Sequence, residues 1–113
     1  GDDYFKYEDK VFEMFINRIN DLLDSDEVPN IFVDATHLNE KARNKVLDRL
    51  HLNEDVWIVP VDVRPSLERC IEQNNQRSGL AHVPESVIRK MYDSYEYPTY
   101  HEKYFYHMII VRV

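Results

Sequence analysis

The sequence has little glycine, little cysteine and no long hydrophobic run. Only 2 of its 113 residues are glycine, so the chain has almost no glycine from which a glycine-rich phosphate-binding loop could form. The single cysteine, Cys70, excludes an internal disulfide and fits a reducing cytosol, so we expect a cytoplasmic protein. No stretch approaches the roughly 20 apolar residues of a membrane span, and no basic-then-apolar leader opens the chain. Neither a membrane partner nor a signal peptide is therefore expected.

Charge and histidine spacing narrow the function classes further. The formal net charge of -7 argues against broad affinity for nucleic acid or anionic membranes, although it leaves room for a small basic site. The five histidines show no zinc-type spacing and have no cysteine partner at such a spacing. We therefore expect no metal site built by this chain. The histidines are His37, His51, His82, His101 and His107.

Hydrophobic spacing predicts an α/β fold. Apolar residues recur at helical spacing in four segments and form strand-like runs in three others. The expected helices cover residues 8–23, 39–50, 65–73 and 84–91, and the expected strands cover residues 31–33, 56–63 and 106–113. Such alternation implies a parallel sheet with right-handed crossovers. We predict a single α/β domain over residues 1–113 that starts partway through its fold, because no strand precedes the first helix.

Asp34 is the first candidate site residue. It follows Ile31-Phe32-Val33, a run that is apolar on both faces and therefore typical of a strand buried in a parallel sheet. Open α/β sheets bind their ligands at the carboxyl ends of such strands. Asp34 can equally cap the turn before the next helix, because aspartate is common in turns and at helix starts.

Three segments, in this order, resemble the later two-thirds of a P-loop kinase of the polynucleotide-kinase-like, AAA-domain ATP-binding type. The run from Val33 to Asn39, followed by Arg43, resembles the family's strand-end Asp-x-Thr-Asn segment, with His37 where asparagine is commoner. The second segment, within residues 74–85, resembles the family's lid, because it reads Asn-Asn-Gln-Arg-Ser-Gly and then His-Val-Pro-Glu. We place the lid-like segment at residues 74–84. Met-Tyr at 91–92 and Pro-Thr at 98–99 resemble its closing segment.

This resemblance implies a fold and an activity. The fold is a three-layer P-loop NTPase-like parallel sheet with flanking helices, incomplete because the Walker A strand and the following strand are missing. The activity is ATP-dependent phosphoryl transfer to a hydroxyl acceptor, such as a polynucleotide 5′ end or a small molecule, with ATP and Mg²⁺ in the complete protein. Because Gly-x-x-x-x-Gly-Lys-Ser/Thr is absent, this chain alone should be inactive and should bind no cofactor tightly.

The resemblance also assigns catalytic and nucleotide-binding residues. Arg77 would be the lid arginine that places a permanent cation on the transferring phosphate, with Asn74 beside it on the nucleotide side. Asp34 would lie on the acceptor side and act with Arg77. Each has a structural alternative. Arg77 can be an exposed arginine near a helix end, and Asn74 can stiffen the lid or merely terminate a helix.

The substrate-binding candidates are Thr36, Asn39 and Arg43. Each has a structural alternative: Thr36 can make a local backbone hydrogen bond, Asn39 can cap a helix and Arg43 can face solvent. The tyrosine-rich stretch of residues 92–106 could stack a nucleobase, but packing against the sheet is the interpretation we prefer. A second class of function is a non-catalytic module that pairs with another chain or, through an exposed sheet, forms a homo-oligomer.

Overall fold

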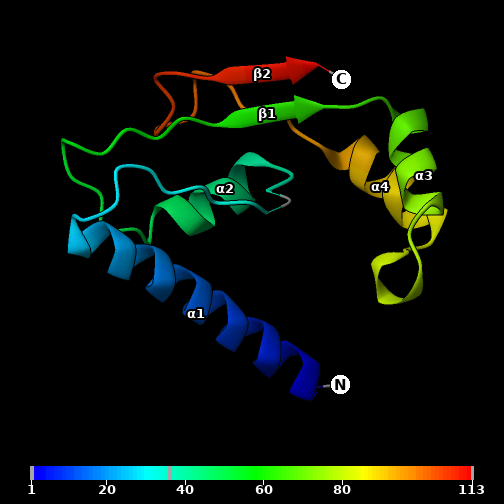
Figure 1. The fold of residues 1–113 in the computed structure, drawn as a ribbon, viewed down its shortest axis with the longest axis horizontal. Helices are drawn as coiled ribbons and strands as arrows, with labels where there is room; N and C mark the ends of the chain where they lie inside the picture. The colour runs from blue at the N-terminus through cyan, green and yellow to red at the C-terminus, as the bar shows by residue number, and fades with distance from the viewer. Residues whose placement is uncertain (1, 36, 113) are drawn as a thin grey trace. The chain divides into compact units, whose positions relative to one another are not determined.

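The computed structural model describes residues 2–35 and 37–112 and confirms an α/β protein with a parallel sheet (Figure 1). Within these residues it has four α-helices, one short 3-10 helix and two strands. Along the chain they are α1 (Asp2–Ser25), α2 (Glu40–Leu47), β1 (Val61–Arg64), α3 (Leu67–Asn75), η1 (Gly79–Ala81), α4 (Glu85–Ser94) and β2 (Ile109–Arg112).

The chain divides into two compact units. Unit 1 comprises residues 1–36 and 43–57, and unit 2 comprises residues 37–42 and 58–113. The single domain stays a prediction.

Unit 1 is built on α1. The helix begins at Asp2, several residues before the start that the sequence predicts, and its apolar spacing gives the unit a small core. That core consists of Ile16, Ile19 and Val46. The Phe12 ring lies beneath two cations, with Lys45 Nζ 4.6 Å and Arg49 Cζ 5.3 Å from its centroid. Cation–π contacts of this kind add to the apolar packing that holds α1 to the last turn of α2 and to the segment after it.

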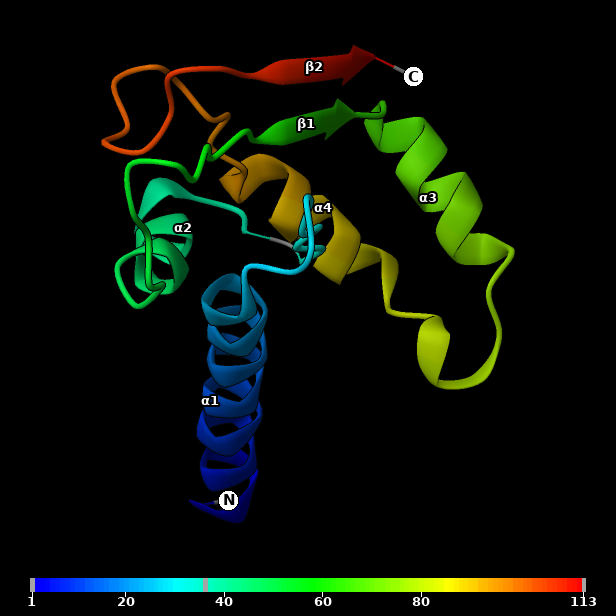
Figure 2. The ribbon, with the colours of Figure 1, turned by 60° about the vertical axis from the view of Figure 1, so that its left-hand side comes forward.

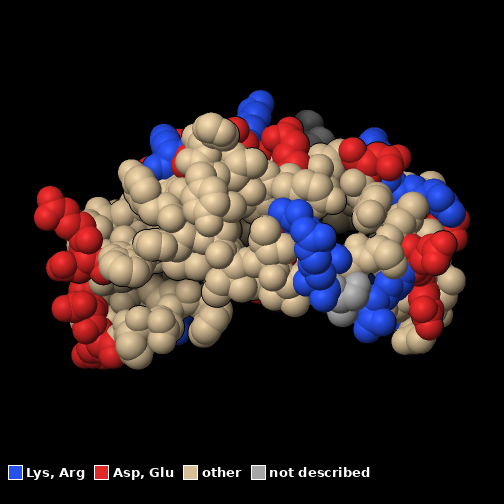
Figure 3. Space-filling view, turned by 90° about the horizontal axis from the view of Figure 1, so that it is seen from above, with Lys and Arg blue, Asp and Glu red and all other residues tan. Residues whose placement is uncertain are grey.

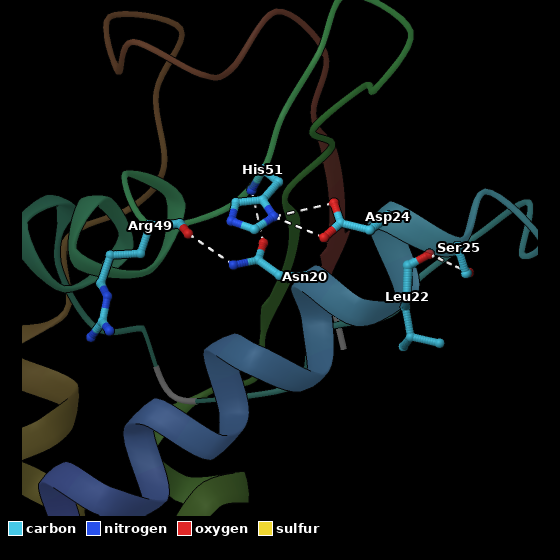
Figure 4. A network of polar contacts seen from close by, with 6 residues as sticks. All are labelled: Asn20, Leu22, Asp24, Ser25, Arg49 and His51. Carbon is cyan, nitrogen blue, oxygen red and sulfur yellow. Dashed lines mark hydrogen bonds and ion pairs between the residues drawn. The ribbon is translucent and has the colours of Figure 1, made fainter.

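A buried asparagine joins the last turns of α1 to the chain beyond α2 (Figure 4). Asn20 Nδ2 donates to the Arg49 carbonyl at 3.1 Å, and Asn20 Oδ1 accepts from the His51 backbone N–H at 2.8 Å. The same turn carries a hydrogen bond between His51 Nδ1 and Asp24 Oδ2 at 3.0 Å. Because both of these side chains are more than half exposed, we expect Asn20 to contribute more to stability than this contact.

The predicted strand at residues 31–33 is wrong. Residues 31–34 form neither helix nor strand, and Phe32 is 89% exposed. A strand needs a neighbour to pair with, and no strand among residues 2–35 and 37–112 pairs with this segment. An apolar run signals that a segment is suited to burial, but it cannot supply the pairing partner. The other two strands exist and are shorter than their apolar runs.

Unit 2 contains the parallel pair β1 and β2. Val61 lies opposite Ile109 and Arg64 opposite Arg112. Pro60 lies just before β1, and its carbonyl accepts from the Ile109 N–H at 3.0 Å. Because Pro60 precedes the strand, the backbone N–H that proline lacks is not needed for strand pairing. Since side chains alternate along a strand, Asp62 and Arg64 share one face of β1 and two valines share the other. The charged face is covered while the valine face is open to solvent.

The crossover from β1 to β2 is a helical hairpin. Ser66 caps α3, because its Oγ accepts from the Arg69 N–H at 3.1 Å, and Pro84 precedes α4. Figure 2 shows α3 and α4 side by side, joined through η1. Among the described helices, none is both long and apolar enough to cross a membrane.

Candidate functional site

The lid-like segment, residues 74–84, is closed by a side-chain clamp. Asn74 is 1% exposed, its Oδ1 accepts from the Val83 N–H at 3.0 Å, and its Nδ2 donates to the Val83 carbonyl at 2.7 Å. These two hydrogen bonds reproduce the pairing of two backbone amides and close the segment into a loop. Asn74 therefore stiffens the lid-like segment, which is one of the two structural alternatives for it, and its amide is already engaged within the chain.

Arg77 lies inside this loop. Its backbone N–H donates to the Asn74 carbonyl at 3.0 Å, and its exposed side chain makes no hydrogen bond or ion pair with the part of the chain that the structure describes. Gly79 has φ of +61°, a backbone conformation that glycine adopts without strain. The clamp thus fixes both ends of the loop and leaves a guanidinium available to an anion.

A buried carboxylate organises the carboxyl end of β1. Asp62 is 3% exposed, and its Oδ1 accepts from the Tyr95 hydroxyl at 2.6 Å while its Oδ2 accepts from Arg64 Nε at 2.6 Å. Arg64 Cζ lies 4.0 Å from the centroid of the Tyr97 ring, and Tyr95 meets Tyr97 edge to face at 5.1 Å. Both carboxylate oxygens are satisfied, and the buried negative charge is compensated by an adjacent cation.

These contacts brace the helical hairpin at both ends. α3 begins at Leu67, just after Arg64, and Tyr95 follows the last residue of α4. We define the Asp62 cluster as Asp62, Arg64, Tyr95 and Tyr97. This cluster therefore holds the start of α3 and the end of α4 to the sheet. The Asn74 clamp closes the hairpin at its tip. The lid-like segment is consequently held in place from its base to its end.

The tyrosine-rich stretch is only partly packed. Phe105 is buried, as packing against the sheet predicts, but Tyr92, Tyr97, Tyr100 and Tyr106 are exposed. Glu102 anchors the turn between them, because its Oε2 accepts from the Thr99 N–H at 3.0 Å. The view onto the β2 side shows a broad area without lysine, arginine, aspartate or glutamate (Figure 3). The packing interpretation therefore fails for Tyr92, Tyr100 and Tyr106, whereas the Tyr97 ring still contacts Arg64 of β1.

Asn39 is the substrate-binding candidate whose local role is defined. Its Oδ1 accepts from the Ala42 N–H at 2.8 Å, so it caps α2, as its structural alternative predicts. The adjacent Leu38 carbonyl accepts from the Glu96 N–H at 2.7 Å. This contact places Asn39 beside the segment that supplies Tyr95 and Tyr97 to the Asp62 cluster. Asn39, Asn74 and Arg77 all belong to unit 2.

The remaining candidates are in or next to unit 1. Arg43 is buried, so the solvent-facing alternative is wrong for it. Asp34 is exposed, and its convergence with Arg77 stays a prediction because the two residues belong to different units. Thr36 lies outside the described residues. His37 has φ of 38°, in the left-handed region where asparagine is enriched, so the residue commoner in the resembled family would suit this backbone.

The net charge is unevenly divided between the units. Unit 1 contains 13 acidic and 6 basic residues, a net of -7, whereas unit 2 contains 8 of each and is formally neutral. The charge of the whole chain therefore comes from unit 1. Unit 2 by itself carries no net charge that would repel an anionic ligand at the lid-like segment.

The sequence interpretation missed the Asp62 cluster. Its signal was present in Val-Asp-Val-Arg at residues 61–64, where opposite charges two positions apart must share one face of a strand. Charged residues on the covered face of a sheet require a nearby polar partner. That partner, Tyr95, is 33 positions away in sequence and could not be identified from local spacing.

Metal ligands and relatives add no further candidates. Among residues 2–35 and 37–112, no group of three or more histidine, cysteine, aspartate or glutamate side chains is placed to hold a metal ion. Comparison with known proteins finds no family model, no curated protein and no solved structure that matches the chain.

We expect Asn74→Ala to loosen the lid-like segment. The change leaves the Val83 N–H and carbonyl without their partner, which should lower the free energy of unfolding by about 1–3 kcal/mol. Tryptic cleavage after Arg77 should become faster. Urea unfolding and limited proteolysis measure the two effects. Asn75→Ala, at the exposed neighbouring position, is the matched control and should change neither. Equal cleavage rates in the two variants would contradict the clamp.

We expect Tyr95→Phe to destabilise unit 2. The variant keeps the ring but removes the hydroxyl that donates to the buried Asp62 carboxylate, a loss of about 1.5–3 kcal/mol for a bond to a charged group. Tyr97→Phe keeps the ring beneath Arg64 and should cost less than about 0.5 kcal/mol. Chemical denaturation of both variants checks the difference. Similar midpoints would show that the Asp62 carboxylate does not depend on Tyr95.

Proposed function

We propose that this chain supplies the lid-bearing part of an ATP-dependent P-loop kinase that transfers a phosphoryl group to a hydroxyl acceptor, similar to the polynucleotide kinases. The observation that carries the proposal is Arg77, an exposed cation on a loop whose two ends Asn74 joins through the Val83 backbone. The parallel pairing of β1 with β2 and the helical hairpin between them support it.

Phosphoryl transfer needs charge neutralised and groups aligned more than it needs covalent chemistry from the protein. In our proposal the planar donor fork of Arg77 contacts the transferring phosphate. A loop that is closed at its ends and braced at its base can present that fork without ordering the whole hairpin at each turnover. The residues of unit 2 themselves carry no net charge that would repel a triphosphate.

The acceptor side of the proposed site is assigned to residues before and within α2. Asp34 would orient the acceptor hydroxyl or a bound water, and Thr36 and Arg43 would add polar contacts. Asn39 uses its amide oxygen as the α2 cap, which leaves its amide nitrogen as the group that could contact an acceptor. The acceptor is a polynucleotide 5′ end or a small hydroxyl compound.

The phosphate-binding loop must come from outside these 113 residues. Magnesium bound with ATP neutralises phosphate charge, but the described side chains form no site for it, so we assign it no step. We propose that the strand bearing the Walker A loop pairs with the free edge of β1.

A non-catalytic, self-associating module is the second candidate. It is favoured by the open apolar face of the sheet, formed by Val61, Val63, Ile109 and Val111. Four residues on each of two strands cover only about 13 Å by 10 Å. Stable interfaces bury about 800 Å² on each partner, several times this area. The face is therefore better suited to covering by a further element of the same fold, and we prefer the kinase.

The 113-residue chain alone should neither bind ATP tightly nor transfer its phosphate. It has no loop to hold the β and γ phosphates. Titration calorimetry with ATP and Mg²⁺ on this chain, and on a longer polypeptide that includes a Walker A loop, should give heat of binding only for the longer one. Phosphorylation of an acceptor by the short chain, or no binding by the longer one, would contradict the proposal.

In the complete protein, Arg77→Ala should lower turnover by about 10²–10³-fold, because a donor aimed at transition-state charge is lost. Its thermal stability should change little, since the side chain is exposed. Arg69→Ala, at another exposed arginine of the same hairpin, is the matched control and should retain turnover. Steady-state kinetics and melting curves separate the two effects. Unchanged turnover in Arg77→Ala would remove this residue from the site.

A further inference from the structure

Both strands of the sheet end in an arginine. β1 ends at Arg64 and β2 ends at Arg112, and the parallel register pairs these two residues directly. Paired residues of neighbouring strands lie about 4.8 Å apart, and their side chains project from the same face because the pleats of the two strands are in phase. Figures 1 and 2 both show the two arrows ending at the same edge. We call Arg64 and Arg112 the arginine pair.

The arginine pair is only partly neutralised by its surroundings. Asp62 compensates Arg64, because its Oδ2 accepts from Arg64 Nε at 2.6 Å, and its other oxygen is occupied by the Tyr95 hydroxyl. The Arg112 side chain is exposed and makes no hydrogen bond or ion pair with any described residue. Asp62 and the arginine pair together therefore have one net positive charge. Like charges at directly paired positions normally destabilise a sheet, so a bound anion would relieve a repulsion that the fold retains.

The Arg64 guanidinium has a fixed orientation. Its Cζ lies 4.0 Å from the centroid of the Tyr97 ring, and its Nε is bonded to the buried Asp62. A guanidinium has five N–H donors, so the four on its terminal nitrogens remain, and none of them has an acceptor in the part of the chain that the structure describes. The side chain is 23% exposed. A cation that is already held in place loses little conformational entropy when it binds a ligand.

Position and geometry indicate the class of ligand. Open α/β sheets bind their ligands at the carboxyl ends of parallel strands, and the arginine pair lies at that edge. Guanidinium groups match the oxygens of carboxylates and phosphates. A carboxylate has two oxygens in one plane, which a single guanidinium fork already satisfies. The oxygens of a phosphate point in different directions, so one phosphate can accept from two neighbouring forks at once.

We propose that the arginine pair binds a phosphate group at the carboxyl edge of the sheet. Arg64 and Arg112 each donate to different oxygens of the phosphate, while Asp62 holds Arg64 and does not contact the ligand. Because the site has one net positive charge and is open to water, we expect a dissociation constant of about 1–10 mM. Such weak binding agrees with the absence of tight ATP binding by this chain. The site uses neither Arg77 nor the acceptor-side residues, so it does not rest on the proposed kinase function.

The test is a titration of the 113-residue chain with inorganic phosphate at constant ionic strength, which is kept constant with sodium chloride. NMR follows the backbone amide and the Nε–H signals of Arg64 and Arg112. A second titration uses glycerol 3-phosphate, so the two affinities show whether the site takes free phosphate or a phosphate ester. Arg112→Gln removes one cation of the pair. Arg69→Gln is the matched control, because it removes an exposed cation elsewhere in unit 2.

We expect both arginines of the unchanged chain to shift together and to saturate with one dissociation constant. Arg112→Gln should raise that constant about tenfold, because one of the two donor forks is lost, whereas Arg69→Gln should leave it unchanged. Arg112 is chosen over Arg64 because it is exposed, and replacing it leaves the Asp62 carboxylate with both of its donors. Melting curves check that both variants keep the stability of the unchanged chain.

Three outcomes would overturn the proposal. The first is the absence of saturable shifts at Arg64 and Arg112 with either probe. The second is equal affinity in Arg112→Gln and the unchanged chain. The third is an equal loss of affinity in Arg69→Gln and Arg112→Gln, which would assign the shifts to general charge attraction. Failure of the longer polypeptide to bind ATP leaves these results unaffected, so failures of the two proposals are distinguishable.

Discussion

The pair of hydrogen bonds on the Asp62 carboxylate is the interaction on which unit 2 depends. One oxygen accepts from Arg64 on the same strand, and the other accepts from Tyr95, which follows α4. A buried carboxylate without these donors would be costly, so the strand and the segment after α4 must stay together. The chain between β1 and Tyr95, which includes both helices of the hairpin and the lid-like segment, therefore leaves the sheet and returns to it at the Asp62 carboxylate.

Asparagine plays the same part in both units. Asn20 in unit 1 and Asn74 in unit 2 are buried, and each uses its amide oxygen and nitrogen to pair with the backbone of a remote segment. An amide side chain has the donor and acceptor that one residue of a sheet partner would offer. Residues 2–35 and 37–112 form only two short strands, and these side chains replace part of the backbone pairing that a larger sheet would provide.

The formal charge is divided unevenly between the two units. Unit 1 contains the whole net charge of the chain. Unit 2 is neutral overall and exposes Arg77 together with Tyr92, Tyr97, Tyr100 and Tyr106. A chain-wide charge of -7 conceals this difference.

The sequence by itself determined the helices, because their spacing, Ser66, Asn39 and Pro84 act within a few residues of one another. It also placed the two strands that pair, although not their ends. Only the tertiary structure decided which apolar run became a strand, since Ile31–Val33 has the right composition but pairs with neither of the strands that the structure describes. Likewise, it alone showed that Asn74 holds a loop, that Arg43 is buried and that Asp62 has a tyrosine donor 33 positions away. Strand pairing and the compensation of buried charge depend on contacts between distant segments, and local spacing does not encode them.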